Sequence, residues 1–367
     1  MELGDPVIVA AVEGGGTSFV VAIAALEDGK REILHRTEVD SSHDRPQQTL
    51  KECADFLKQH KPSRGYHALG LATFGPVGLN PSRSDYGCIL PTSPKASWRR
   101  VNLVQPLQRA CRGSRQLVVR VETDVNAPAL AEYMACDPSK ISSVSYVTVG
   151  TGVGVGLVID GKCVHGRMHP EGGHVPVQPL AGDNFPGYSW GIERSPFKGV
   201  HTVEGLASSV ALTERLAHSQ QLSSVSALDR SVLSELPDDH DVWNHAANAV
   251  ANLCVTMLLL TSTEKIVLGG GVLKRNGLME QIRLRTVQLL NGYLELPTDM
   301  ADLITFSKYG DDAGLMGAIV MAEKGLADES ATTATKDSGS HFWSGVIHGL
   351  VTGAALAGAA LLLSRRK

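Results

Sequence analysis

A short pattern of strand, glycine turn and strand occurs twice in this chain, and it limits the possible folds more than any other feature. Residues 6–12 and 19–26 are apolar and flank a glycine-rich turn. The same pattern returns at residues 144–149 and 155–159. Apolar runs joined by a glycine turn indicate a β-hairpin. The repetition therefore predicts two related lobes, each of which opens with such a hairpin.

The remaining pattern alternates between strands and helices. Helical periodicity is found at residues 49–59, 127–134, 245–260 and 313–323. Short buried strands are indicated at residues 68–73, 117–122 and 266–268. Helices that alternate with buried strands predict the α/β class. The 367 residues are enough for two lobes with separate cores.

The composition excludes some function classes. Hydrophobic residues make up 43% of the chain, charged residues 20%, and the net charge is −4. These are ordinary values for an enzyme, and without an excess of basic residues we expect no nucleic-acid partner. None of the six cysteines forms a Cys-x-x-Cys pair, so we expect reduced thiols and no disulfide framework.

Three glycine clusters follow apolar strands in this sequence. They comprise Gly14, Gly15 and Gly16, then Gly150, Gly152 and Gly154, and finally Gly269, Gly270 and Gly271. Successive backbone N–H groups in such turns form a concave anion site that side chains would obstruct. One cluster alone is as often a plain turn, whereas three together indicate phosphate binding. Their spacing matches neither the P-loop nor the Rossmann pattern.

Six motifs occur in a characteristic order. They are Glu13-Gly14-Gly15-Gly16-Thr17, Thr123-Asp124-Val125-Asn126-Ala127, Thr148-Val149-Gly150-Thr151-Gly152-Val153-Gly154, His169-Pro170-Glu171-Gly172-Gly173-His174, Glu204-Gly205-Leu206-Ala207-Ser208 and Leu268-Gly269-Gly270-Gly271-Val272. In this order they resemble the ROK family of sugar kinases over residues 7–325. Residues 74–77 and 91–98 are similar to segments of its bacterial-type fructokinase branch.

The resemblance implies a fold and an activity. The fold would be the two-lobed actin-like ATPase (ribonuclease H-like) α/β fold. The activity would be transfer of the γ-phosphate of ATP to a hexose hydroxyl, with D-fructose giving fructose 6-phosphate as the first expectation. Mannose, glucose and N-acetylmannosamine remain alternatives. ATP, Mg²⁺ and a homodimer are also implied.

The resemblance also sets the expected domain boundaries. We expect an N-terminal lobe at residues 1–125, joined by a closing helix at residues 312–326. The C-terminal lobe would cover residues 126–311. A flexible linker at residues 327–341 and a tail at residues 342–363 would follow.

Asp124 is the candidate catalytic residue. It follows a predicted strand and precedes a predicted helix. From position alone it could be a helix N-cap, or a general base that takes the proton from an attacking sugar hydroxyl. The family resemblance implies the second role, and the two roles are compatible in geometry.

The resemblance places ATP at the three glycine clusters. Thr17 and Thr151 could each donate a hydroxyl group to a phosphate, and Glu13 is the candidate for holding Mg²⁺, through water. Family members commonly carry a lysine after the threonine of the first turn, where this chain has Ser18. This difference removes a positive charge near the phosphates and could lower the rate.

The sugar is expected to bind polar side chains of the second lobe. The resemblance assigns Glu171, His174 and Glu204 to sugar binding, together with Asn126 and Thr123. Carboxylates and imidazole suit a hexose because they form directional hydrogen bonds with neighbouring hydroxyls.

Many family members hold a structural zinc with one histidine and three cysteines, but this chain has no cysteine between Cys163 and Cys254. A structural zinc needs about four such ligands. We therefore predict no zinc, and expect the loop to be held by packing. Candidates for that packing are Phe185, Tyr188, Trp190 and Phe197.

Residues 342–363 carry no formal charge and precede a short basic end. An uncharged stretch of this length can span a bilayer as a helix. We therefore expect a C-terminal transmembrane helix, with the kinase on the cytosolic side of an organelle membrane. The alternative is a helix that packs on a partner.

The sequence also bears on two other functions. A catalytically weak or inactive sugar sensor or scaffold on the same fold is favoured slightly by the missing lysine and zinc ligands, and opposed by Asp124 and the three glycine turns. A DNA-binding repressor is not expected, because the first strand begins near residue 7 and leaves no room for a helix-turn-helix domain before it.

Overall fold

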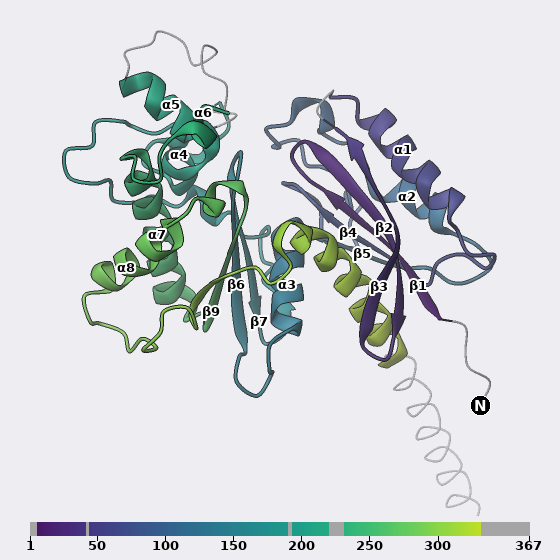
Figure 1. The fold of residues 1–367 in the computed structure, drawn as a ribbon. Helices are drawn as coiled ribbons and strands as arrows, with labels where there is room; N and C mark the ends of the chain where they lie inside the picture. Colours follow the sequence, from purple (N-terminus) through teal and green to yellow (C-terminus); the bar gives the residue numbers. More distant parts are fainter. Residues whose placement is uncertain (1–5, 42–43, 190–192, 220–230, 332–367) are drawn as a thin grey trace, which may run out of the picture. The chain divides into compact units, whose positions relative to one another are not determined.

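The computed structural model describes residues 6–41, 44–189, 193–219 and 231–331. The described residues up to 322 belong to one compact unit, and residues 323–331 belong to a second. The first unit contains two five-stranded sheets, each with helices packed against it (Figure 1). The α/β class with two sheets, expected from the sequence, is confirmed.

The first sheet has the strand order β3-β2-β1-β4-β5. Its strands are β1 (Val7–Gly14), β2 (Ser18–Glu27), β3 (Lys30–Asp40), β4 (Ala68–Thr73) and β5 (Val118–Thr123). The first three strands form an antiparallel meander, and β4 and β5 run parallel to β1. The hairpin expected from the first glycine turn is therefore β1–β2, which pairs Gly14 with Phe19.

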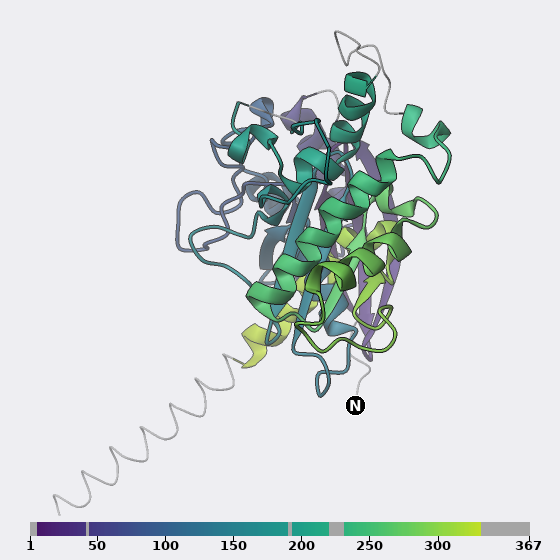
Figure 2. The ribbon, with the colours of Figure 1, turned by 90° about the vertical axis from the view of Figure 1, so that its left-hand side faces the viewer.

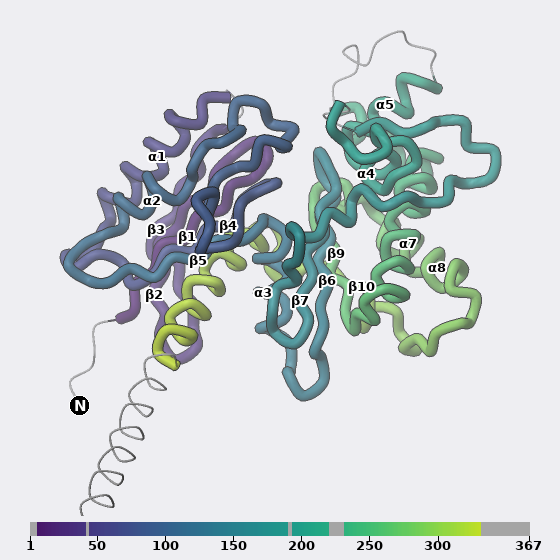
Figure 3. The backbone as a smooth tube through the Cα atoms, turned by 180° about the vertical axis from the view of Figure 1, so that it is seen from behind, coloured from purple at the N-terminus to yellow at the C-terminus, as the bar shows by residue number. Residues whose placement is uncertain are grey.

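The two faces of the first sheet are covered by different helices. Helices α1 (Pro46–Gln59) and α2 (Val104–Cys111) share a buried core with one face (Figure 3). A helix that begins at residue 313 covers the other face (Figure 1). Its approach requires Gly70 in β4, because any side chain there would collide with the Ala318 carbonyl.

The second sheet repeats the topology of the first, with the order β10-β9-β6-β7-β8. Its strands are β6 (Ser143–Val149), β7 (Val153–Ile159), β8 (Lys162–Cys163), β9 (Lys265–Gly269) and β10 (Ile304–Phe306). Strands β6, β7 and β8 are antiparallel, whereas β9 and β10 run parallel to β6. The repeat expected from the glycine hairpins is thus present in the sheets.

Helices also cover both faces of the second sheet. Helices α7 (Val242–Thr261) and α8 (Leu278–Leu290) share the larger core with one face (Figure 2, green). Helix α3 (Asn126–Met134) lies on the other face. Gly156 in β7 allows this contact, since a side chain there would collide with the Val125 carbonyl.

Further helices connect these elements. They are α4 (Val203–Ala207), α5 (Ser209–Ser219), α6 (Val232–Glu235) and the 3₁₀ turns η1 (Ala96–Trp98), η2 (Gly172–His174), η3 (Pro196–Gly199), η5 (Gly271–Lys274) and η6 (Gly310–Asp312). The expected lobe boundaries at residues 125–126 and 311–312 stay predictions, and so does the linker at residues 327–341.

The predicted membrane localisation is wrong. Within the described ranges no helix is both long and apolar enough to cross a membrane. Helix α7 has 20 residues, but Asn244, His245, Asn248 and Asn252 interrupt its apolar sequence. Residues 342–363, on which the predicted transmembrane helix and organelle anchor rested, lie outside the described residues.

Candidate active site

Asp124 lies at the carboxyl end of the first sheet. Its backbone N–H donates to the Thr73 carbonyl (2.9 Å) and so extends the β4–β5 pairing by one residue. The N-cap position of α3 is Val125, whose side chain makes no capping hydrogen bond. The N-cap interpretation of Asp124 therefore does not hold, and its carboxyl is available for chemistry.

The environment of Asp124 suits a base that works near neutral pH. Burial raises the pKa of Asp124 to about 6, and the opposing charge of Lys95 is a smaller effect. A carboxylate with a pKa near the working pH can accept a proton and release it again.

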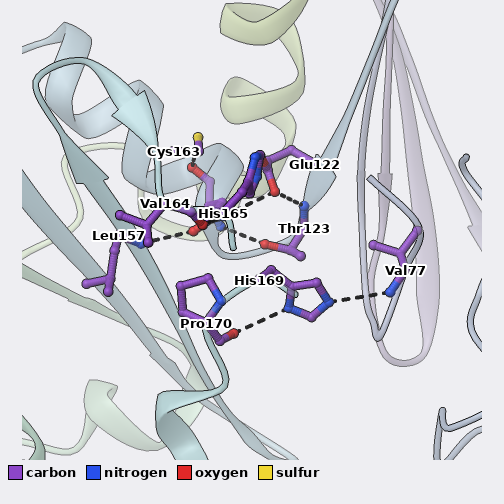
Figure 4. A network of polar contacts seen from close by, with 10 residues as sticks. Val77, Glu122, Thr123, Leu157, Cys163, Val164, His165, His169 and Pro170 are labelled. Atoms are coloured by element: carbon purple, nitrogen blue, oxygen red, sulfur yellow. Dashed lines mark hydrogen bonds and ion pairs between the residues drawn. The ribbon is translucent and has the colours of Figure 1, made fainter. Parts of the chain in front are cut away.

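A buried polar network fixes the turn that carries Asp124 (Figure 4). Glu122 accepts hydrogen bonds from the Thr123 backbone N–H (2.9 Å) and the Asn126 side-chain amide (3.2 Å). Thr123 Oγ1 accepts from the Asn126 backbone N–H (3.0 Å), and Asn126 Oδ1 accepts from Leu157 N–H (2.9 Å). Thr123 and Asn126, both assigned to sugar binding from the sequence, are buried and bonded within this network.

His165 joins this network and His169 lies beside it, and neither was assigned a role from the sequence. His165 Nε2 lies 2.6 Å from Glu122 Oε2, and this hydrogen bond raises the pKa of His165. The backbone N–H of Val77 donates to His169 Nε2 (3.4 Å), which attaches the loop after β4 to the His-Pro-Glu motif. His169 begins the motif at residues 169–174, and His165 lies shortly before that motif. The sequence therefore contained a signal for both residues, although no function was assigned to them.

Glu171 lies near enough to both Asp124 and Glu204 for their charges to interact. Burial raises the pKa of Glu171 to about 7, with further contributions from Asp124 and then Glu204. Glu204 lies in α4 and accepts the Val153 backbone N–H (3.1 Å). It also accepts a hydrogen bond from Ser189. The structure thus brings together the three carboxylates that we predicted from separate motifs.

His174 ends the 3₁₀ turn η2, and its ring carries an unsatisfied atom. The Nδ1 atom is buried and has no hydrogen-bond partner among the described residues. A buried polar atom without a partner costs free energy unless a ligand supplies the partner. This observation fits the predicted contact of His174 with a sugar hydroxyl.

The first glycine turn lies between β1 and β2. The Gly15 N–H donates to the Ser18 carbonyl (2.9 Å), and a Cβ added to Gly16 would meet no atom within 4 Å. Thr17 is exposed at the tip. Lys95, which the sequence analysis did not single out, donates to the carbonyls of Gly16 (2.5 Å) and Gly15 (3.4 Å).

Glu13, the predicted Mg²⁺ residue, precedes this turn. Burial raises its pKa to about 7, the charge of Asp124 raises it further, and a hydrogen bond from the Leu315 backbone opposes both. A divalent cation would favour the charged form of both carboxyls, and Mg²⁺ prefers oxygen donors. The residues therefore fit an ion held mainly by the ATP phosphates.

A metal held by the protein alone is a different case. In the ranges that the structure describes, no group of three or more His, Cys, Asp or Glu residues could hold one. The absence of a structural zinc stays a prediction.

The loop expected to hold zinc in relatives is fastened here by an ion-pair network. Arg215 binds both carboxylate oxygens of Asp183 (2.7 and 2.8 Å), and His245 Nδ1 lies 3.1 Å from the same carboxylate. Phe185 is buried under Arg215, which lies 4.6 Å from its ring centroid. Of the other residues expected to pack this loop, Tyr188 is partly buried, Phe197 is 63% exposed and Trp190 lies outside the described residues.

The second and third glycine turns meet at one cavity of about 550 Å³. Gly150, Thr151 and Gly271 line it, so turns far apart in the sequence share a site. Gly270 has a φ of +96° and packs on the Val149 backbone, which only glycine tolerates. Gly154 and Gly269 lie within or at the end of strands β7 and β9 and contact side chains of the core.

Several side chains of this cavity lie outside the motifs found in the sequence. Trp243 and Arg275 both line it, and the Arg275 guanidinium lies 4.5 Å from the Trp243 ring centroid. Asp238 holds Arg275 at 2.9 Å. A cavity with an aromatic ring and two glycine turns can accommodate a base and its phosphates. No local motif marked these residues, since α6, α7 and η5 each supply part of the wall.

The chain is similar to known proteins over most of its length. The family model described as "ROK family" matches residues 9–325. A fructokinase from Zymomonas mobilis subsp. mobilis is 34% identical over 322 residues, which are 87% of this chain and 97% of that protein. A putative fructokinase from Bacillus subtilis is 30% identical over 324 residues, covering 88% and 97%. The crystal structure of a ROK hexokinase from Thermus thermophilus superposes with a TM-score of 0.65 at 25% identity, covering 88% and 99%.

Proposed function

The chain belongs to the ROK family, and on that premise we propose that it transfers the γ-phosphate of ATP to a hexose hydroxyl, with D-fructose as the preferred acceptor. Its fold is the two-sheet α/β fold of ROK sugar kinases. The observation that carries the proposal is the position of Asp124. It lies at a strand end with its pKa near 6, and its charge acts on Glu171 and Glu13.

The proposed reaction uses Asp124 as the general base. The sugar hydroxyl oxygen attacks the γ-phosphorus, the bond from that phosphorus to the bridging oxygen of ADP breaks, and Asp124 takes the hydroxyl proton. Glu171, His174 and Glu204 orient the sugar by hydrogen bonds to its other hydroxyls. Thr123 and Asn126 position Asp124, because their buried hydrogen-bond network fixes the turn on which Asp124 lies.

The nucleotide is assigned to the glycine turns. The cavity beside Gly150 and Gly271 would take the adenosine, and the turn at Gly14, Gly15 and Gly16 would face the transferred phosphate. Mg²⁺ bound with ATP neutralises phosphate charge, and Glu13 is the residue proposed to hold it. Correct positioning supplies much of the rate in such transfers.

Fructose as the acceptor rests on the two fructokinase relatives and on the segments at residues 74–77 and 91–98. The test is ADP production by the full chain with Mg-ATP and, in separate reactions, fructose, mannose, glucose, N-acetylmannosamine or no sugar. We expect the largest kcat/KM for fructose. A larger value for another sugar would keep the kinase and replace the substrate.

One outcome would refute the proposed kinase activity itself. If a folded protein that binds ATP shows no sugar-dependent ADP production, the hypothesis of a sugar sensor or scaffold replaces the proposed kinase activity. The homodimer expected from the family stays a prediction, which sedimentation of the same preparation would measure.

A further inference from the structure

Lys95 makes an unusual set of contacts at the first glycine turn. The segment from Glu13 to Ser18 contains no cationic side chain of its own, although it is assigned to bind phosphate. Lys95 lies far away in sequence, just before η1, yet its Nζ contacts the carbonyls of Gly15 and Gly16. A distant part of the chain therefore supplies a cation to this turn.

An aromatic cluster holds the lysine in place. Its Nζ lies 3.9 Å from the Phe74 ring centroid. Phe74 packs edge-on against Trp98 at 5.4 Å, and Trp98 stacks on Phe19 at 5.1 Å. Trp98 is fully buried, and Phe19 is the second residue of β2, the strand after the turn. The direction of the lysine is thus fixed by the core of the first sheet, which favours a defined function over a mobile surface charge.

The ammonium group is not neutralised by an ion pair within the part of the chain that the structure describes. The carboxylates of Asp124 and Asp44 act on it only through space, while burial is the larger effect and lowers the pKa of Lys95 to about 8. An ammonium has three N–H donors, and the two carbonyls leave one for a ligand. A partly buried cation without a bound anion is costly, so an anion that arrives at the turn is stabilised.

We propose that Lys95 binds the oxygens of the transferred phosphoryl group and supplies the positive charge that the first glycine turn lacks. This role rests on the proposed kinase function, in which the phosphoryl group passes between this turn and Asp124. Charge develops on the phosphoryl oxygens during transfer, and a fixed cation beside them stabilises that charge. Lys95 would thereby replace the charge whose absence at Ser18 suggested a slow enzyme.

The test compares Lys95→Met with Lys95→Arg and with the control Lys51→Met. Methionine keeps an unbranched stem against Phe74 and removes the charge, whereas arginine keeps the charge. Lys51 is an exposed lysine of α1 that pairs with Asp55. The thermal midpoint of each variant is measured first, so that loss of folding is separated from loss of charge.

For Lys95→Met we expect kcat with the best sugar to fall about 10²- to 10³-fold, with the sugar KM little changed. We expect its dissociation constant for ATP to rise about tenfold while that for ADP stays the same, since ADP lacks the bound group. Lys95→Arg should recover part of the rate, and Lys51→Met should behave as the wild type.

Three results would overturn the proposal. The first is a Lys95→Met enzyme within a few-fold of the wild-type kcat. The second is an equal loss of ATP and ADP affinity, which would mean that Lys95 only pins the turn through its carbonyls. The third is a wild-type protein that does not bind ATP.

Failure of the proposed kinase function can be distinguished from failure of the proposed role of Lys95. It appears as a wild-type protein without sugar-dependent turnover, and the comparison of ATP with ADP binding then still decides the role of Lys95.

Discussion

The two sheets of this protein share a topology but carry different chemistry at equivalent positions. In each sheet the residue after the last parallel strand donates its N–H to the neighbouring strand: Asp124 to Thr73 (2.9 Å) and Ser307 to Leu268 (3.1 Å). In the second sheet the Ser307 side chain is bonded to Glu132 (2.6 Å). In the first sheet the equivalent residue is a carboxylate beside the proposed sugar site. The same backbone position is thus structural in one half and is proposed to be catalytic in the other.

The two glycine hairpins differ in the same way. The carbonyls of the first turn are contacted by the cation Lys95. The second turn is held by an anion, because Glu204 accepts the Val153 N–H and lies against Gly152. The first turn therefore suits negative charge, whereas the second connects the cavity proposed for the nucleotide to the proposed sugar ligands. A shared fold positions both turns, and the side chains brought to them decide what each one binds.

The largest effect on kcat is expected from substituting Asp124, the proposed general base at the end of the first sheet. Asp124→Asn should lower kcat by about two to four orders of magnitude, because the amide cannot take the hydroxyl proton. The equivalent change in the second sheet, Ser307→Ala, should leave kcat nearly unchanged. Steady-state kinetics with matched circular dichroism spectra would measure both. Near-normal turnover by Asp124→Asn would refute its assignment as the base.

The next largest effect is expected on the free energy of unfolding, from a substitution in the half of the protein that contains the second sheet. Arg215→Met should lower the free energy of unfolding by about 3 kcal/mol, because Asp183 would lose its main partner while remaining buried. Arg83→Met breaks an exposed pair in the first half, where Arg83 is 67% exposed, and should leave the free energy of unfolding nearly unchanged. Urea denaturation measures both values.

An experiment with a chelator could contradict the prediction that this ion pair holds the loop without a metal. If o-phenanthroline lowered the thermal midpoint as much as Arg215→Met does, a bound metal would be holding the loop, and the prediction of no zinc would be wrong. We expect no change.

The two glycine turns can be compared directly by adding one methyl group to each. A Cβ at Gly152 would lie 2.6 Å from Glu204 Oε2, so Gly152→Ala should displace that carboxylate and raise the sugar KM about tenfold. A Cβ at Gly16 meets no protein atom, so Gly16→Ala should leave stability unchanged and raise the KM for ATP. If both variants changed the same KM, the two turns would not have separate roles.

The smallest effect is a pH dependence of stability at the sugar site. Burial raises the pKa of Glu171 from 4.5 to about 7, so the folded protein binds this proton more tightly than the unfolded chain does. This contribution is fully present below pH 4.5 and is lost as the pH rises through 7. Glu171→Gln should therefore be more stable than the wild type at pH 8, by on the order of 1 kcal/mol because a third of the side chain is exposed.

The control for this prediction is Glu38→Gln, an exposed carboxylate in the first sheet. Urea denaturation at pH 5 and pH 8 measures all three proteins. A Glu171→Gln protein with the same advantage over the wild type at both pH values would show that burial of the charge is not the cause.

Much of the fold followed from local sequence. The hairpins, the strand Ala68–Thr73 and the helix around residues 245–260 were expected from apolar periodicity, because each pattern is complete within a few residues. Strand β3 was missed, since as an exposed edge strand it has a mostly polar sequence. The membrane prediction failed because an uncharged stretch indicates only that a helix could enter a bilayer.

The sequence by itself determined the carboxylates and glycine turns of the candidate site, because each lies in a short motif with a recognisable spacing. Only the tertiary structure decided which side chains complete them. Lys95 reaches Gly15 across 80 positions, and Arg215 reaches Asp183 across 32. Such pairs leave no local pattern, since the packing of strands and helices sets the distance between them. For the same reason Asp124 and Ser307, at equivalent ends of two similar sheets, acquired different surroundings.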